Sequence, residues 1–307
     1  MLKELGFIKA FLVIGLVLTI IGGIIFSIAM TANGWDFSVL ASHVAQKRVV
    51  EIVDQEEINS ITSVKIDFTT ADVSVVYHEE NKITVEGYDL VKRKGEVVEK
   101  LSAEVANGEL VVTLEKSKPV TFEIVSSGKR VVTIKLPKDM VVDFSAELTT
   151  GDVVVGQSEK AIAFNDVTIK TSTGDIVLNG NVECNKLSVE NTTGDTYING
   201  KLTANSFTRN ANTGDLIISA RVECQSISVK NTTGDVVCNS YITANVINIK
   251  TTTGDVTLKL LGEMADYNYS YKITTGKSNI SPIVSPSATK TVTVTCSTGD
   301  SNIYFEK

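Results

Sequence analysis

Residues 171–195 read TSTGDIVLNGNVECNKLSVENTTGD, a segment that contains the triplet Thr-Gly-Asp near its start and again at its end. Four successive intervals between triplets are 20 residues long, and the other three are 22 or 23 residues long. Repetition at a fixed period of this length is typical of repeat architectures. The sequence therefore predicts a repeat protein. The triplet threonines are Thr150, Thr173, Thr193, Thr213, Thr233, Thr253 and Thr298, and Thr275 begins a Thr-Gly-Lys variant.

Alignment of the copies on their threonines reveals three apolar columns, which lie five, nine and fourteen residues after each threonine. Around these columns apolar and polar residues alternate with a period of two, as in half-buried strands. Each repeat therefore contains about three short strands, separated by turn residues such as the triplet itself. The columns contain Leu178, Ile198, Ile218, Cys238 and Leu258; Val182, Leu202, Val222 and Ile242; and Leu187, Phe207, Ile227 and Ile247.

Two topologies use such strands: an antiparallel meander, or a coil in which each repeat is one rung stacked on the last. With three strands per repeat, a meander would reverse direction at every copy and place identical sequences in alternating environments. A coil stacks like on like, which suits equivalent columns of Ile, Leu and Val. We therefore expect an all-β fold, with a parallel β-solenoid of roughly 20-residue rungs over residues 140–307.

Residues 47–139 are rich in strand patterns but lack the regular period. We interpret them as an irregular β cap, because the open end of a solenoid needs to be covered. Within this region, residues 64–76 resemble a degraded rung around Thr70-Ala71-Asp72. Residues 102–115 predict a hairpin around Asn107-Gly108. Residues 33–46 are predicted to be a short stalk.

The N-terminal segment at 10–32 contains no charged residue and is mostly Ile, Leu, Val and Phe. It is long enough to cross a hydrocarbon layer of about 30 Å, so we predict one transmembrane helix after a tail at 1–9. Lys3 and Lys9 precede it, and the first basic residue after it is Lys47. The positive-inside rule therefore places the tail in the cytoplasm and residues 33–307 outside it. The alternative is a signal peptide cleaved near Ser27-Ile28-Ala29, although the apolar run is long for one.

The composition narrows the classes of function. A net charge of -7 argues against nucleic acid as a partner. With 4 Cys and 2 His there is no disulfide scaffold and little material for histidine-based catalysis or a metal site. Cys184, Cys224 and Cys238 fall where other copies have small or apolar residues, so we expect them to be buried. His43 and His78 lie outside the repeats, and we predict neither an enzyme nor a cofactor.

The sharpest chemical feature is a row of aspartates, one per triplet, that stacking would align along one corner of the coil. Such a row is a candidate interaction edge for cations or a basic polymer. The alternative is turn chemistry, in which glycine supplies a positive φ and the Thr and Asp side chains bond to the turn backbone. The aspartates are Asp152, Asp175, Asp195, Asp215, Asp235, Asp255 and Asp300, and the turn glycines are Gly151, Gly174, Gly194, Gly214, Gly234, Gly254, Gly276 and Gly299.

The segment VTIKLPKD at 132–139, followed by Thr-Thr-Gly-Asp-Val and Thr-Ser-Thr-Gly-Asp-Ile, resembles a bacterial family of unknown function named "putative adhesins". Similar proteins occur in operons for envelope stress in Gram-positive bacteria. The resemblance covers roughly residues 60–307 and departs at Thr275-Gly276-Lys277, where the acid is lost. It implies the solenoid architecture and a location at the cell envelope.

These patterns together predict a non-enzymatic, membrane-anchored solenoid outside the cytoplasm that binds an envelope polymer or a protein partner through the faces of its coil. A structural alternative is a scaffold that self-assembles. A third alternative is an enzyme that processes envelope polysaccharides, but such enzymes need long loops that four successive repeats lack. Self-association and the identity of the partner stay open.

Overall fold

The computed structural model describes residues 43–92, 95–116, 130–157 and 161–306, together with Thr19, Gly22, Gly23, Ser27 and Thr31. Among these residues, no helix has the length and apolar character needed to cross a membrane. The predicted transmembrane helix at 10–32 falls almost entirely outside the described residues, as do the tail at 1–9 and most of the stalk at 33–46.

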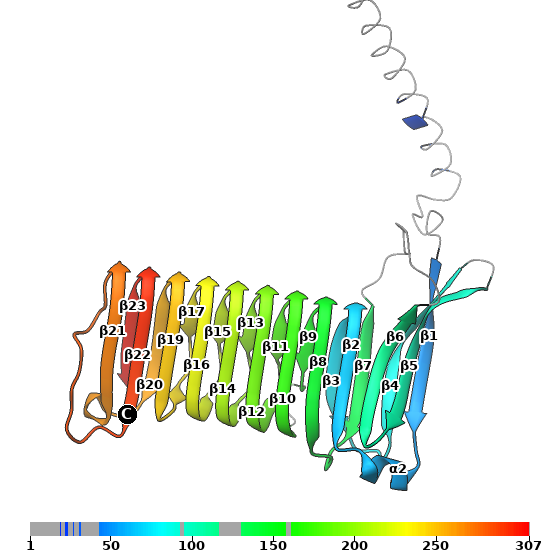
Figure 1. Cartoon of the computed structure of the whole chain (residues 1–307), viewed down its shortest axis with the longest axis horizontal. Coiled ribbons are helices and arrows are strands. Elements are labelled where there is room, and N and C mark those ends of the chain that lie inside the picture. Colours follow the sequence, from blue (N-terminus) through cyan, green and yellow to red (C-terminus); the bar gives the residue numbers. More distant parts are fainter. Residues whose placement is uncertain are drawn as a thin grey trace, which may run out of the picture.

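The repeats form a parallel coil whose rungs stack along one axis (Figure 1). A regular rung has one long strand and one short strand, joined at the Thr-Gly-Asp triplet. In spatial order the long strands are β8 (Val142–Thr150), β10 (Ala161–Thr173), β12 (Asn181–Thr193), β14 (Leu202–Thr213), β16 (Val222–Thr233), β19 (Val246–Thr253), β22 (Lys290–Thr298) and β21 (Tyr267–Thr275). The strands on the opposite side are β9 (Val153–Val155), β11 (Ile176–Leu178), β13 (Thr196–Ile198), β15 (Leu216–Ile218), β17 (Val236–Cys238), β20 (Val256–Leu261) and β23 (Ser301–Glu306).

Equivalent residues of successive rungs lie directly beside one another. Leu187 pairs with Phe207, and Phe207 pairs with Ile227. All residues of the three predicted apolar columns are buried in one continuous core. The all-β, solenoid-like prediction and its register are therefore confirmed.

The predicted count of three strands per rung differs from the observed count of two. The long strand bends at Asn185, where the ladder omits the pair with Asn205 between the flanking pairs Cys184–Ala204 and Lys186–Ser206. The strand continues through this corner in most rungs, so two predicted strands are one. In the last regular rung the corner separates β18 (Ile242–Thr243) from β19.

The glycine of each triplet is fixed by two independent constraints. Gly214 has a φ of +137°, a conformation that side-chain-bearing residues rarely adopt. A Cβ added to Gly214 would also lie 2.0 Å from the carbonyl oxygen of Gly194 in the preceding rung. All eight predicted turn glycines have a positive φ. The glycines therefore let neighbouring corners stack in close contact.

The C-terminal rungs do not stack in chain order. After β20 and a 3-10 turn at Met264–Asp266, the chain forms the outermost strand β21. It then returns, so that β22 inserts between β19 and β21 and β23 pairs with β20. A segment in between folds over the free edge of β21, where the Ile283 and Tyr269 backbones exchange two hydrogen bonds.

At the other end, the coil continues into the region predicted to be irregular. β2 (Ser63–Thr70) and β3 (Asp72–His78) form a rung beside β8 and β9, with Thr70 next to Thr150 as its sequence suggested. β6 (Glu109–Lys116) and β7 (Val131–Pro137) form a further rung. The remaining cap is antiparallel and contains β1 (His43–Ile52), β4 (Ile83–Lys92), β5 (Val97–Ala106) and the helix α2 (Gln55–Ser60).

Candidate functional site: an aspartate ladder and a polar groove

The structure brings the predicted aspartates together as a continuous ladder along one corner of the coil. The Oδ1 atom of each aspartate accepts a hydrogen bond from the backbone N–H at the equivalent position of the next rung. Asp195 accepts from Asp215 at 2.8 Å, and Asp215 accepts from Asp235 at 2.8 Å. The same bond, at 2.7–2.9 Å, joins every member of the row from Asp152 to Asp300 in spatial order. The acceptor therefore binds the neighbouring rung rather than its own turn.

The two triplets that depart from the Thr-Gly-Asp pattern lie at the two ends of the ladder. Asp72, in the degraded rung, begins the ladder by accepting the N–H of Asp152. Lys277 ends it, because its N–H donates to Asp300 at 2.7 Å and no further rung follows it in the described part of the chain. An acid at position 277 would have no N–H to accept. The departure of Thr275-Gly276-Lys277 from the repeat thus marks the end of the stack.

One side chain contacts the ladder from the short strands. The hydroxyl of Tyr197 donates to Oδ2 of Asp195 at 2.9 Å. This hydrogen bond, burial of the hydroxyl, and the charges of Asp195 and its neighbours together raise the pKa of Tyr197 to about 12.

The cysteines and histidines do not form a chemical site in the described structure. Cys184 and Cys238 are buried as expected, and Cys224 is half-buried. Burial raises the pKa of Cys184 and Cys224 to about 12, so their thiols are poor nucleophiles. His78 bonds to the carbonyl oxygen of Lys82. Nowhere in the described ranges do three or more His, Cys, Asp or Glu side chains come close enough to hold a metal ion.

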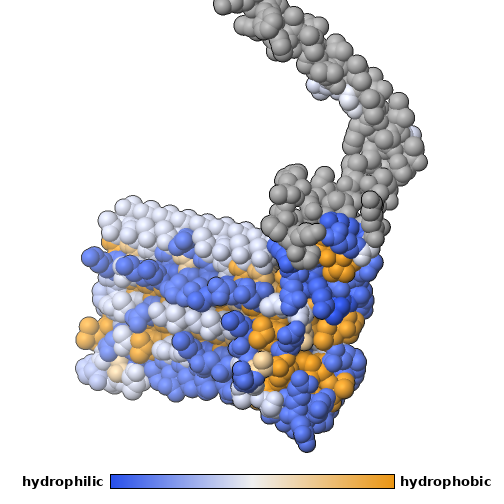
Figure 2. Space-filling view, turned by 45° about the vertical axis from the view of Figure 1, so that its right-hand side comes forward, coloured by the Kyte–Doolittle hydropathy of each residue, from blue (hydrophilic) through white to orange (hydrophobic). Residues whose placement is uncertain are grey.

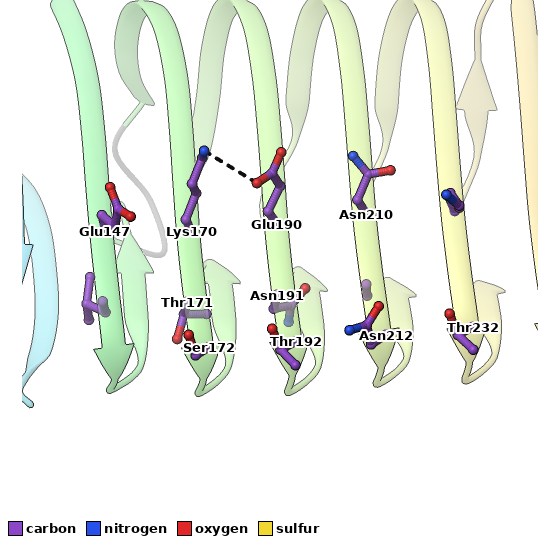
Figure 3. A pocket seen from close by; sticks show the side chains of 13 residues that line it. Glu147, Lys170, Thr171, Ser172, Glu190, Asn191, Thr192, Asn210, Asn212 and Thr232 are labelled. Carbon is purple, nitrogen blue, oxygen red and sulfur yellow. Dashed lines mark ion pairs between the residues drawn. The ribbon is translucent and has the colours of Figure 1, made fainter. Parts of the chain in front are cut away.

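A polar groove crosses the long strands of five neighbouring rungs, from β8 to β16, and has a volume of about 570 Å³ (Figure 3). One wall has charged or amide side chains, and the other has hydroxyl or amide side chains. In Figure 2, pale and blue bands run along the coil axis, as expected when equivalent side chains stack. We call the polar groove on the long strands the rung groove. It is lined by Glu147, Leu148, Lys170, Thr171, Ser172, Glu190, Asn191, Thr192, Asn210, Ala211, Asn212, Lys230 and Thr232.

The charges of the groove wall alternate along the coil. Lys170 and Glu190 form an ion pair at 3.5 Å, and each side chain is about half exposed. Such exposed pairs add little to stability. Glu147 lies before this pair, and Asn210 and Lys230 continue the wall after it. The wall is therefore polar along its whole length but has no net charge.

A buried arginine lies in the core next to the groove floor, and the periodicity alone does not identify it. Arg209 is fully buried in a column where the neighbouring rungs have Val189 and Val229. Its guanidinium donates to Thr196 Oγ1 at 2.9 Å, to Asn231 Oδ1, and to the carbonyl oxygens of Gly214 and Asp215. Burial lowers the pKa of Arg209 to about 10. The only sequence signal is that Arg209 and Thr196 both replace apolar column residues.

Comparisons with known proteins agree with this architecture. A family model described as Toastrack DUF4097 matches residues 61–304. A "putative adhesin" from Bacteroides fragilis NCTC 9343 superposes with a TM-score of 0.51 and 16% identity, covering 85% of this chain and 97% of that one. A "putative adhesin" from Parabacteroides distasonis ATCC 8503 superposes with a TM-score of 0.52 and 12% identity, covering 84% and 96%. At these identities the likeness shows the fold alone. No curated protein matches the chain.

Proposed function

Since the chain belongs to the Toastrack DUF4097 family, we propose that it is a non-enzymatic, membrane-anchored binding protein of the cell envelope. In this proposal, the rung groove holds a neutral, hydroxyl-rich linear polymer, such as an envelope polysaccharide, along the coil axis. The observation that carries the proposal is the repetition of the same polar wall across five rungs.

The chemistry of the groove suits such a ligand. Ser172, Thr192 and Thr232 present hydroxyl groups, and Asn212 presents an amide, so this wall both donates and accepts hydrogen bonds. Rungs about 4.8 Å apart repeat these groups on four rungs, over about 14 Å, which favours a ligand with its own short repeat. The walls have no net charge, which disfavours a polyanion or polycation. Few apolar side chains line the groove, which disfavours a lipid or an apolar helix.

The location is inferred from the sequence. The uncharged apolar segment at 10–32 and the basic residues before it support an N-terminal anchor with the coil outside the cytoplasm. A maleimide label on Glu306→Cys tests this topology in intact cells. Labelling by a membrane-impermeant reagent supports the proposal, and protection until the cells are lysed contradicts it. The wild-type chain, whose own cysteines are mostly buried, is the control.

Binding is tested with the full chain in nanodiscs and with purified neutral and anionic wall polysaccharides. Thr192→Arg fills the groove, whereas Thr208→Arg places the same side chain on an outward position of the same face that does not line the groove. We expect saturable binding of a neutral polymer, a loss of at least tenfold in affinity for Thr192→Arg, and less than a twofold change for Thr208→Arg. Equal effects of the two variants, or cleavage of the polymer, would contradict the proposal.

A further inference from the structure

The short strands present an apolar row to the outside of the coil. Val154, Val177, Tyr197, Ile217 and Val237 occupy the middle positions of β9, β11, β13, β15 and β17. Each pairs in register with the next, and each is partly exposed because its side chain points away from the core. We call these five residues the apolar strip.

The apolar strip differs from the other outward rows. The outward positions at the centre of the long strands are polar, as in the stacked Ser188, Thr208 and Ser228. The strip also has polar ends, because the equivalent residue is Ser74 in the rung before Val154 and Thr257 in the rung after Val237. The strip is therefore a continuous, partly exposed apolar row on five rungs, bounded by polar residues at both ends.

The aspartate ladder runs directly beside the strip. Five aspartates of the ladder each lie two residues before a strip residue, so both side chains project from the same face of the chain: Asp152, Asp175, Asp195, Asp215 and Asp235. The hydrogen bond from Tyr197 to Asp195 shows that the two rows are in contact. The surface therefore combines a narrow apolar row with a parallel row of negative charge, and it lies on the opposite strands from the rung groove.

We propose that the apolar strip and the aspartate ladder together bind a basic amphipathic α-helix of a partner protein, lying along the coil axis. The apolar seam of a helix advances about 5.3 Å every 3.5 residues, close to the rung spacing of about 4.8 Å. The strip spans about 19 Å, which corresponds to about 13 helical residues. Lysine or arginine residues flanking the seam would lie over the carboxylates. A second copy of this surface would bring two acidic rows together, so the partner is a different protein.

The test uses the full chain in phosphatidylcholine nanodiscs and a fluorescent 14-residue helical peptide with a leucine seam flanked by lysines. A peptide with glutamate in place of each lysine is the charge control, and empty nanodiscs are the blank. We expect saturable binding of the lysine peptide that weakens at least fivefold between 50 and 300 mM NaCl, and no binding of the glutamate peptide. The variant Val177→Thr/Ile217→Thr/Val237→Thr removes the apolar groups and keeps β-branched shapes. It should raise the Kd at least tenfold.

Matched substitutions on the opposite strands are the control. Ser188→Thr/Thr208→Ser/Ser228→Thr should leave the Kd within twofold. If the triple threonine variant melts early, Val237→Thr alone, which copies Thr257 of the next rung, should still raise the Kd about threefold. The proposal is overturned if the threonine variants bind as tightly as the wild type, or if the glutamate peptide binds equally. It is also overturned if sedimentation shows a dimer that the triple variant abolishes, because the strip would then bind a second copy.

The two proposals are independent. Thr192→Arg, which fills the rung groove, should leave peptide binding unchanged. A failure of polysaccharide binding therefore leaves this inference standing, and the reverse also holds.

Discussion

Substitutions of Asp215 distinguish two roles of the aspartate ladder: stabilising the fold through hydrogen bonds between rungs, or binding cations. In the wild type the N–H of Asp235 donates to Oδ1 of Asp215 at 2.8 Å, and Asp215→Ala removes this acceptor. Loss of a hydrogen bond to a charged group costs about 1.5–3 kcal/mol, and this N–H is only part-buried, so water can replace some of the bond. We expect a loss of about 1.5 kcal/mol, which for a domain of this size lowers the Tm by roughly 3–6 °C.

Asp215→Asn is the matched variant. Its amide oxygen can still accept from Asp235, and the substitution removes one negative charge from a stack of carboxylates. We therefore expect a change in unfolding free energy of less than about 0.5 kcal/mol. Asp300→Ala breaks the same bond at the last rung, where Lys277 is the donor. Because terminal rungs can fray without unfolding the whole coil, its effect on the Tm should be smaller than that of Asp215→Ala.

Thermal unfolding followed by circular dichroism measures these differences, and amide hydrogen exchange at Asp235 reports the broken bond directly. If Asp215→Asn is as harmful as Asp215→Ala, and if millimolar calcium raises the Tm of the wild type but not of Asp215→Asn, the row binds cations. We expect no effect of calcium.

Three further substitutions test the register, the corner and the buried arginine by thermal or urea unfolding. Ile218→Asp places an unpaired charge in a core column and should cost about 4 kcal/mol or more, whereas an unchanged melting curve would show that the register is wrong. Gly214→Val should cost at least about 3 kcal/mol because its Cβ would overlap the carbonyl of Gly194, and retained stability would mean that the corner can open at little cost. Arg209→Val should cost about 3 kcal/mol by leaving its buried partners without a donor. Adding Thr196→Ile, which copies Ile176 of the preceding rung, should recover more than half of that loss, and no recovery would contradict the pairing of these two residues.

The columns and their register could be predicted from the sequence because in-register stacking gives every copy the same environment. Phe207, for example, lies between the equivalent residues of the rungs before and after it. Because all three side chains point into the same core, their column must be apolar throughout. The number of strands per rung could not be predicted in the same way. Asparagine is common in turns, so Asn185 predicts a break between two strands, but the parallel ladder on either side of it holds the chain in one bent strand.

The order of the last rungs could not be predicted from periodicity. β21 and β22 both alternate apolar and polar residues, so either strand could follow β19. In the structure the outermost strand is β21, whose free edge pairs with the segment around Ile283. The one sequence feature that indicates this order is the lysine at position 277, where the other triplets have an aspartate. The rung groove was also missed, because the alternation of residues shows which side chains point outward but not which of them enclose a hollow. Arg209 was missed because the neighbouring residues of its column are apolar, and one polar residue does not change the pattern of a column.

The direction of the ladder bears on how the coil ends. Each rung offers a carboxylate to the N–H of the next outer rung, so a rung added at the outer end gains this hydrogen bond only where an acid precedes it. At the outermost rung Lys277 occupies that position and offers no acceptor. The backbone of Ile283 covers part of the β21 edge, and the antiparallel strands β1, β4 and β5 close the opposite end. Both ends therefore carry features that a polymerising edge would lack. This arrangement disfavours end-to-end assembly and agrees with the proposed binding along the long faces of the coil, where the rung groove and the apolar strip lie.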